Sequence, residues 1–132
     1  MTHKILLVED EELNRTLVKA VLARAAIEAV RDAEVLDASS LAMARTLLGS
    51  EHVDLILLDM NLPDGNGLTL ARELAEHDPP AGRHRPAVVA VTASVLPQDR
   101  AAALAAGCDG FLDKPYAAAA LVQVVATHLP ED

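Results

Sequence analysis

The chain has 132 residues and is 52% hydrophobic, which suits one domain large enough to bury a core without disulfides. Its formal net charge of −9 argues against direct binding to nucleic acids, because an acidic surface repels phosphate backbones. The lone cysteine, Cys108, excludes an internal disulfide, and the first apolar run is too short for a signal peptide or a membrane span. We therefore expect residues 1–132 to form a single, soluble, cytoplasmic domain without membrane contact.

Five short apolar runs predict strands. Residues 5–8, 55–58 and 87–91 are apolar at every position, which is typical of parallel strands that helices cover on both faces. Residues 34–38 alternate in polarity, as an edge strand does, and residues 111–112 form the shortest candidate.

Amphipathic stretches between these runs predict helices. In the first stretch, Leu13, Leu17, Ala20 and Val21 have helical spacing and are expected to form the apolar face. The later helices are expected near residues 41–48, 68–75, 97–107 and 117–128.

Capping residues mark several helix ends. Ser39 or Ser40 is expected to cap the second helix, and Gly49 to end it. Pro97 stands where the first turn of a helix tolerates proline, and Gly107 stands where that helix would end. Strands that alternate with helices predict βαβ units, and hence a doubly wound, three-layer α/β domain with a parallel sheet.

Polar residues follow the predicted strands at their carboxyl ends, where ligands of open α/β sheets bind. Glu9 and Asp10 follow the first run, Asp59 the third, Thr92 the fourth, and Lys114 comes two residues after the last. Each has an ordinary structural interpretation, as a residue of a helix first turn, a turn, a helix cap or an exposed loop. Because all of them fall at equivalent strand ends, a shared site is the better hypothesis.

The chemistry of this site follows from its charges. Three carboxylates at close range need a counter-charge, and oxygen ligands suit Mg²⁺. One carboxylate could then act as a nucleophile and form an acyl phosphate. A lysine ammonium and a threonine hydroxyl would neutralise and hydrogen-bond the transferring phosphoryl group.

The combination resembles the receiver domains of response regulators in two-component signalling, and the resemblance covers essentially the whole chain. It implies a flavodoxin-like (βα)5 domain with a five-stranded parallel sheet in the order 2-1-3-4-5. It also implies a signalling switch that catalyses its own phosphorylation and dephosphorylation, and is not otherwise an enzyme. The segments that carry it are residues 7–11 (LVEDE), 54–64 (DLILLDMNLPD), 91–94 (VTAS) and 111–115 (FLDKP).

The resemblance implies a role for each residue of the site. Asp59 matches the phospho-acceptor, and Thr92 and Lys114 match the pair that contacts the phosphoryl group. Thr92 and Phe111 match the two residues that switch conformation, and the Lys114–Pro115 bond is expected to be cis. The expected Mg²⁺ ligands are Glu9, Asp10, Asp59 and the backbone carbonyl of Asn61.

The resemblance also implies the partners, which are a histidine kinase or a histidine phosphotransfer protein and a downstream effector protein. Two other functions are alternatives for this sequence. A pseudo-receiver that only binds partners would lack some of the site residues, and none is lost here. A phosphatase with an aspartyl nucleophile would need a second aspartate two residues after Asp59, where this chain has Asn61.

Two segments depart from the pattern of the family. Gly65-Asn66-Gly67 replaces the commoner Met-Asp-Gly and makes this loop more permissive. Residues 23–37 are several residues longer than usual, so we expect either an extended first helix or an extra turn.

Overall fold

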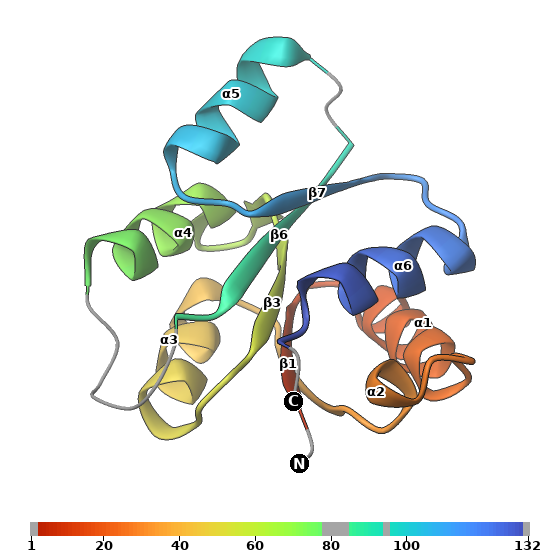
Figure 1. Ribbon diagram of the computed structural model, residues 1–132. Coiled ribbons are helices and arrows are strands. Elements are labelled where there is room, and N and C mark those ends of the chain that lie inside the picture. Colours follow the sequence, from red (N-terminus) through yellow and green to blue (C-terminus); the bar gives the residue numbers. More distant parts are fainter. Residues whose placement is uncertain (1–2, 78–84, 94–95, 131–132) are drawn as a thin grey trace.

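The apolar runs of the sequence form one parallel β-sheet in the computed structural model, which describes residues 3–77, 85–93 and 96–130 (Figure 1). The strands pair in the order β2-β1-β3-β6-β7, so the five predicted strands have the expected order 2-1-3-4-5. They are β1 (Lys4–Val8), β2 (Glu34–Ala38), β3 (Leu55–Asp59), β6 (Ala87–Thr92) and β7 (Gly110–Asp113).

Helices cover both faces of this sheet (Figure 1). One layer consists of α1 (Glu12–Ala23), α2 (Glu28–Arg31) and α6 (Ala118–His128), and the other of α3 (Leu41–Ser50), α4 (Gly67–Glu76) and α5 (Pro97–Ala105). Leu55 and Leu57 of β3 pack into the first layer, and Ile56 and Leu58 pack into the second. This two-sided burial is why β3 has no polar residue before Asp59, and it confirms the predicted doubly wound fold.

The buried face of α1 differs from the prediction. Val18 and Leu22 are buried instead of the predicted stripe. Leu17 and Val18 are both apolar and lie about 100° apart around a helix, so periodicity alone could not decide which of them faces the sheet. Of the predicted stripe, Val21 is half-buried and three residues are exposed: Leu13 (68%), Leu17 (54%) and Ala20.

The long segment between α1 and β2 contains an extra turn, which was one of the two expected alternatives. α1 ends at Ala23, and the short α2 follows before β2 begins. Val30 of α2 is fully buried in the layer of α1 and α6. The additional residues therefore enlarge the core on this face and do not lengthen α1.

The helix ends agree only partly with the prediction. Ser40 caps α3, since its Oγ accepts a hydrogen bond from the Met43 backbone N–H at 3.2 Å. Gly49 does not end this helix, which continues to Ser50, and Gly49 does not adopt the positive φ of a C-terminal glycine cap. Gly107 does follow the end of α5 and has a positive φ of 101°.

A short antiparallel ribbon, formed by β4 (Asn61–Leu62) and β5 (Gly65–Asn66), leads from β3 to α4 and was not predicted. Residues 78–84, whose prolines and glycine are typical of a loop, and Ser94, the last residue of the 91–94 segment, lie outside the described residues. None of the helices in the described part of the chain is long and apolar enough to cross a bilayer.

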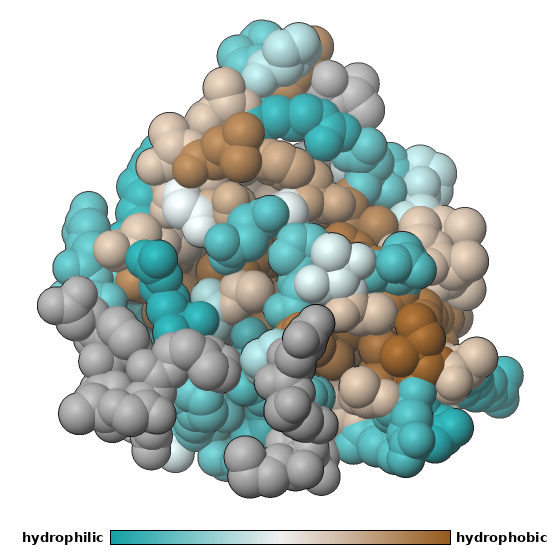
Figure 2. All heavy atoms as spheres, in the orientation of Figure 1, coloured by the Kyte–Doolittle hydropathy of each residue, from teal (hydrophilic) through white to brown (hydrophobic). Residues whose placement is uncertain are grey.

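Hydrophobic residues also reach the surface. Figure 2 shows them among hydrophilic residues over the corner of α1 and α2 and over α5. In the same regions, large apolar side chains are exposed: Leu13, Leu17, Ile27, Leu96 and Leu104.

Candidate functional site

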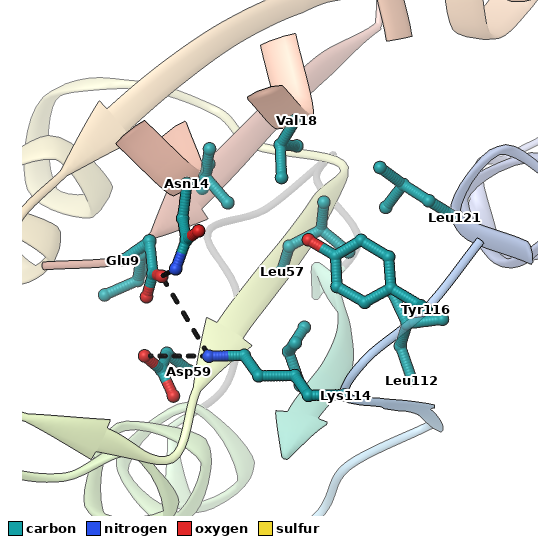
Figure 3. A pocket seen from close by; sticks show the side chains of 12 residues that line it. Glu9, Asn14, Val18, Leu57, Asp59, Leu112, Lys114, Tyr116 and Leu121 are labelled. Carbon is teal, nitrogen blue, oxygen red and sulfur yellow. Dashed lines mark hydrogen bonds and ion pairs between the residues drawn. The ribbon is translucent and has the colours of Figure 1, made fainter. Parts of the chain in front are cut away.

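The carboxyl ends of β1, β3 and β7 bring three charged side chains together (Figure 3). The Nζ atom of Lys114 lies 3.5 Å from Oδ2 of Asp59 and 3.9 Å from Oε1 of Glu9. Glu9 and Asp59 are 5% and 7% exposed, so both carboxylates are almost fully removed from water. Buried charges need partners, and Lys114 supplies one positive charge for the two negative ones.

Asp10 adds a third carboxylate at the exposed side of this group. One carboxylate oxygen from each of Glu9, Asp10 and Asp59 can be chosen so that all three lie within 4.8 Å of one another. Oε2 of Glu9 is buried and receives no hydrogen bond from any residue in the described ranges. An oxygen-only donor set with one unsatisfied buried carboxylate oxygen fits a hard divalent cation.

Electrostatics point in the same direction. Burial, together with the neighbouring Asp59 carboxylate, raises the pKa of Glu9 to about 7. The hydrogen bond from Asn14 and the charge of Lys114 act in the opposite direction and lower it. Glu9 therefore holds a proton readily when no cation is present, and a cation would compete with that proton.

Asn61 lies two residues after Asp59, in β4, and its backbone N–H donates a hydrogen bond of 3.2 Å to Oδ1 of Asp59. This contact fixes one carboxylate oxygen of Asp59 while Lys114 faces the other. Pro115 follows Lys114 through a cis peptide bond, as expected.

Thr92 and Phe111 lie on the other side of the same sheet edge. They line a common hollow of about 210 Å³ between α4 and α5, whereas Glu9, Asp59 and Lys114 line a small neighbouring cavity. Thr92 ends β6, and its backbone carbonyl accepts a hydrogen bond from the Lys114 N–H at 2.8 Å. Thr92 is thus joined through the backbone to the residue that faces Asp59.

Three neighbours of the site were not predicted. Asn14 of α1 donates a hydrogen bond to Glu9, and Tyr116 lies beside Lys114 in the same cavity (Figure 3). Arg100 of α5 lies over the ring of Phe111. Sequence spacing could not identify these contacts, because each joins a side chain on a helix or loop to a strand end.

The ordinary interpretation of the acidic pair does not fit the geometry of Glu9. The first turn of α1 begins at Glu12, two residues beyond the pair, and its acidic residue is Glu12 itself. Glu9 is instead buried beside Asp59 and Lys114. Its burial therefore needs an explanation other than stabilisation of a helix N-terminus.

Comparison with known proteins gives a consistent result. The sequence model of the family described as the response regulator receiver domain matches residues 5–126. The polar-differentiation response regulator DivK of Brucella ovis is 31% identical over 129 residues, which are 98% of each chain. A segment of the hybrid signal transduction histidine kinase G of Dictyostelium discoideum is 34% identical over 112 residues, or 85% of this chain and 3% of that protein. The structure of the chemotaxis response regulator CheY4 of Vibrio cholerae superposes with a TM-score of 0.83 at 21% identity, covering 98% of this chain and 100% of that one.

Proposed function

The chain belongs to the response regulator receiver domain family of two-component signalling proteins, and from this premise we propose that it takes a phosphoryl group from a phosphohistidine donor onto Asp59 with the help of Mg²⁺. The observation that carries the proposal is the buried Asp59 carboxylate, which lies beside Lys114 and groups with two further carboxylates. We take residues 1–132 as a single receiver domain, which the match over residues 5–126 supports.

The chemistry we propose is an in-line displacement at phosphorus. A carboxylate oxygen of Asp59 forms the new P–O bond, and the P–N bond to the donor histidine breaks, so that the electron pair leaves with the imidazole nitrogen. Lys114 Nζ, which is 3.5 Å from Asp59, would bind one phosphoryl oxygen. The hydroxyl of Thr92 would donate a hydrogen bond to another.

The metal would be held by the oxygens that surround Asp59. We assign Glu9, Asp10 and Asp59 as carboxylate ligands, directly or through water, and the backbone carbonyl of Asn61 as a further ligand. When bound, Mg²⁺ supplies positive charge that offsets the carboxylates and the incoming phosphoryl oxygens. The unsatisfied Oε2 atom of Glu9 supports this assignment.

The partners we propose are a histidine kinase or a histidine phosphotransfer protein as donor and a downstream effector protein as reader. The exposed Leu13 and Leu17 of α1 support a donor-binding face, because this helix begins two residues after the acidic pair. A groove of about 560 Å³ lies beside them and is lined by Leu17, Val21, Pro115 and Tyr116 among others. The buried thiol of Cys108 is compatible with a cytoplasmic location, where we place the reaction.

A labelling experiment tests the proposal. The purified chain is incubated with a small-molecule phosphodonor and Mg²⁺, and intact mass is measured. We expect the mass of one phosphoryl group to be added, and we expect no addition for Asp59→Asn or in EDTA. Asp32→Asn, which removes an exposed carboxylate remote from the site, is the matched control and should be labelled normally. Full labelling of Asp59→Asn would refute the assignment, and no labelling of the native chain would favour a pseudo-receiver.

A further inference from the structure

Glu9 is held at three points by hydrogen bonds. Its backbone N–H donates to the carbonyl of Ala38 at 2.9 Å, and its own carbonyl accepts from Nη1 of Arg15 at 2.8 Å. Its side-chain Oε1 accepts from Nδ2 of Asn14 at 2.6 Å. Two consecutive residues of α1 therefore bind the backbone and the side chain of the same acidic residue.

These contacts leave one atom of Glu9 unsatisfied. Oε2 is buried and has no hydrogen-bond donor in the described part of the chain, and it belongs to the carboxylate that joins Asp10 and Asp59 in the acidic group. Figure 3 shows Asn14 beside the Glu9 carboxylate, and the Glu9–Lys114 ion pair is drawn to the same carboxylate. Because an ionised carboxylate can only accept hydrogen bonds, the amide NH₂ of Asn14 is the group that faces Oε1.

We propose that Asn14 is a positioning residue for the metal site: it holds Oε1 of Glu9, so that Oε2 is the oxygen presented to Mg²⁺ or to its bound water. The inference rests on the proposed function and adds a residue to it. Mg²⁺ demands a nearly ideal octahedral arrangement, and a glutamate side chain has several rotatable bonds. Fixing one carboxylate oxygen removes that freedom before the ion arrives, as outer-shell hydrogen bonds do at other metal sites.

Arg15 supports the same arrangement, because its side chain binds the backbone carbonyl of Glu9. Its Nε lies 3.6 Å from Oδ2 of Asp37, and Lys19 Nζ lies 2.7 Å from that oxygen. Asp37 at the end of β2 therefore anchors Arg15, which in turn fixes the carbonyl of Glu9. The Glu9 backbone is tied to β2 by two routes, through Arg15 and through the carbonyl of Ala38.

The competing explanation is that Asn14 merely fastens α1 to the end of β1. Both explanations predict some loss of stability when the hydrogen bond is removed. They differ in the magnesium affinity that they predict for a variant without this hydrogen bond, because a simple fastening does not decide which oxygen of Glu9 faces the ion.

The test uses the variant Asn14→Leu. Leucine is similar in size to asparagine and favours helix formation, but its side chain has no hydrogen-bond donor. Mg²⁺ is titrated into the unphosphorylated chain, and its dissociation constant is measured from backbone amide chemical shifts. We expect binding to weaken by about tenfold or more, which is the usual range for an outer-shell partner. Asn14→Ala is the second variant, and circular dichroism confirms that both fold. Thr16→Ala, an exposed change on the same helix, is the matched control and should bind Mg²⁺ as the native chain does.

A double-mutant cycle separates positioning from fastening. If Asn14 acts through Glu9, Asn14→Leu should have almost no further effect on magnesium affinity in a Glu9→Gln background. The inference would be overturned if Asn14→Leu left the magnesium affinity unchanged, or if it lowered that affinity equally in both backgrounds. The proposed function would still stand in that case, provided that Asp59 of the native chain is phosphorylated. If the native chain bound no Mg²⁺ at all, the proposed function would fail first and this inference with it.

Discussion

The backbone of Gly67, at the start of α4, lies directly against the carbonyl oxygen of Asp59. A Cβ atom at position 67 would overlap that oxygen and would also press on the side chains of Leu58 and Met60. The Gly67 N–H donates a 3.0 Å hydrogen bond to the carbonyl of Met60, which holds the two segments together. A backbone oxygen cannot move aside as the end of a flexible side chain can, so glycine is required here by close approach.

Gly67→Ala should therefore destabilise the fold and slow phosphorylation of Asp59. We expect a loss of about 1–3 kcal/mol in the free energy of unfolding, which is typical of overpacking in a tight site. Gly49→Ala is the matched control, because its Cβ would meet nothing within 4 Å and it lies inside α3. That change should be neutral or stabilise by about 0.5–1 kcal/mol. Urea unfolding measures both, and equal effects of the two changes would contradict the proposed role of Gly67.

Asp64 ties the turn between β4 and β5 to the start of α3. Its Oδ1 and Oδ2 accept hydrogen bonds from the backbone N–H groups of Leu41 and Ala42, at 2.9 and 3.1 Å. Together with Ser40 it satisfies three of the N–H groups in the first turn of α3, which would otherwise lack partners. The hydrogen bond from Leu41, followed by that from Ala42, lowers the pKa of Asp64.

Asp64→Ala should thus lower stability at neutral pH, and the loss should shrink in acid. A carboxylate with a lowered pKa in the folded state contributes stability above its ordinary pKa and loses it as the pH falls through the lowered value. The difference in urea midpoint between the native chain and Asp64→Ala is measured at neutral and at strongly acidic pH. Asp32→Ala provides the control for removing an exposed aspartate. A difference that does not depend on pH would show that Asp64 acts by packing alone.

The sequence was sufficient to predict the convergence of Glu9, Asp59 and Lys114. Three buried strands that run parallel must place their carboxyl ends at one edge, so only the strands had to be recognised. The roles assigned to these residues, and to Asp10, Asn61 and Thr92, stay predictions that the experiments above address.

Features that depend on tertiary packing could not be predicted in this way. The rotation of α1 was misjudged because its sequence offers two adjacent apolar stripes. The stripe of Val18 and Leu22 faces the sheet, and in the same orientation Asn14 and Arg15 contact Glu9, which no periodicity reveals. The β4–β5 ribbon is too short to leave a recognisable pattern of alternation.

Glu9 should make stability depend on pH in the absence of Mg²⁺. Its pKa is raised to about 7 in the folded chain, against 4.5 as its ordinary value. The folded state therefore keeps a proton that the unfolded state has lost, and stability should fall as the pH rises from about 4.5 to about 7. Urea midpoints measured in EDTA across this range should show that fall, and Glu9→Gln should remove it.

Saturating Mg²⁺ should also flatten the profile, because the ion takes the place of the proton. In the same range, the affinity for Mg²⁺ should rise with pH by at most about tenfold per unit, since one proton is displaced. Parallel pH profiles for the native chain and Glu9→Gln would show that another group is responsible.

We expect phosphorylation of Asp59 to reach the surface through Thr92 and Phe111. The guanidinium carbon of Arg100 lies 5.2 Å from the centroid of the Phe111 ring, and Nη2 of Arg100 lies 2.5 and 2.6 Å from the two carboxylate oxygens of Asp113. Thr92 pairs with Asp113 in the sheet and lines the same hollow of about 210 Å³ as Phe111. Arg100 thereby holds Phe111 and the end of β7 against α5 in the unphosphorylated chain.

An acyl phosphate on Asp59 would add charge and acceptor oxygens at the sheet edge, and Thr92 would bond one of them by moving its hydroxyl inward. We expect Phe111 to turn into the hollow, to leave the face of Arg100, and to change the surface formed by α5, β7 and α6. Structures with and without beryllofluoride, a phosphate mimic, would show this directly. Unchanged rotamers of Thr92 and Phe111 in a beryllofluoride complex would rule out the mechanism, even with Asp59 fully occupied.

Arg100→Ala tests, in the unphosphorylated chain, whether the contact between Arg100 and the Phe111 ring keeps the ring in place. Loss of a cation–π contact worth about 0.5–1 kcal/mol should raise the population of the inward Phe111 conformer by about two- to fivefold, because the two states differ in that contact. The population is followed by NMR of a labelled Phe111 ring. Arg31→Ala removes an exposed arginine ion pair with Asp32 on α2, in the opposite helical layer, and should leave the ring unaffected. If both variants give the native spectrum, Arg100 does not bias the switch, and Phe111 is simply a core residue that Arg100 happens to cover.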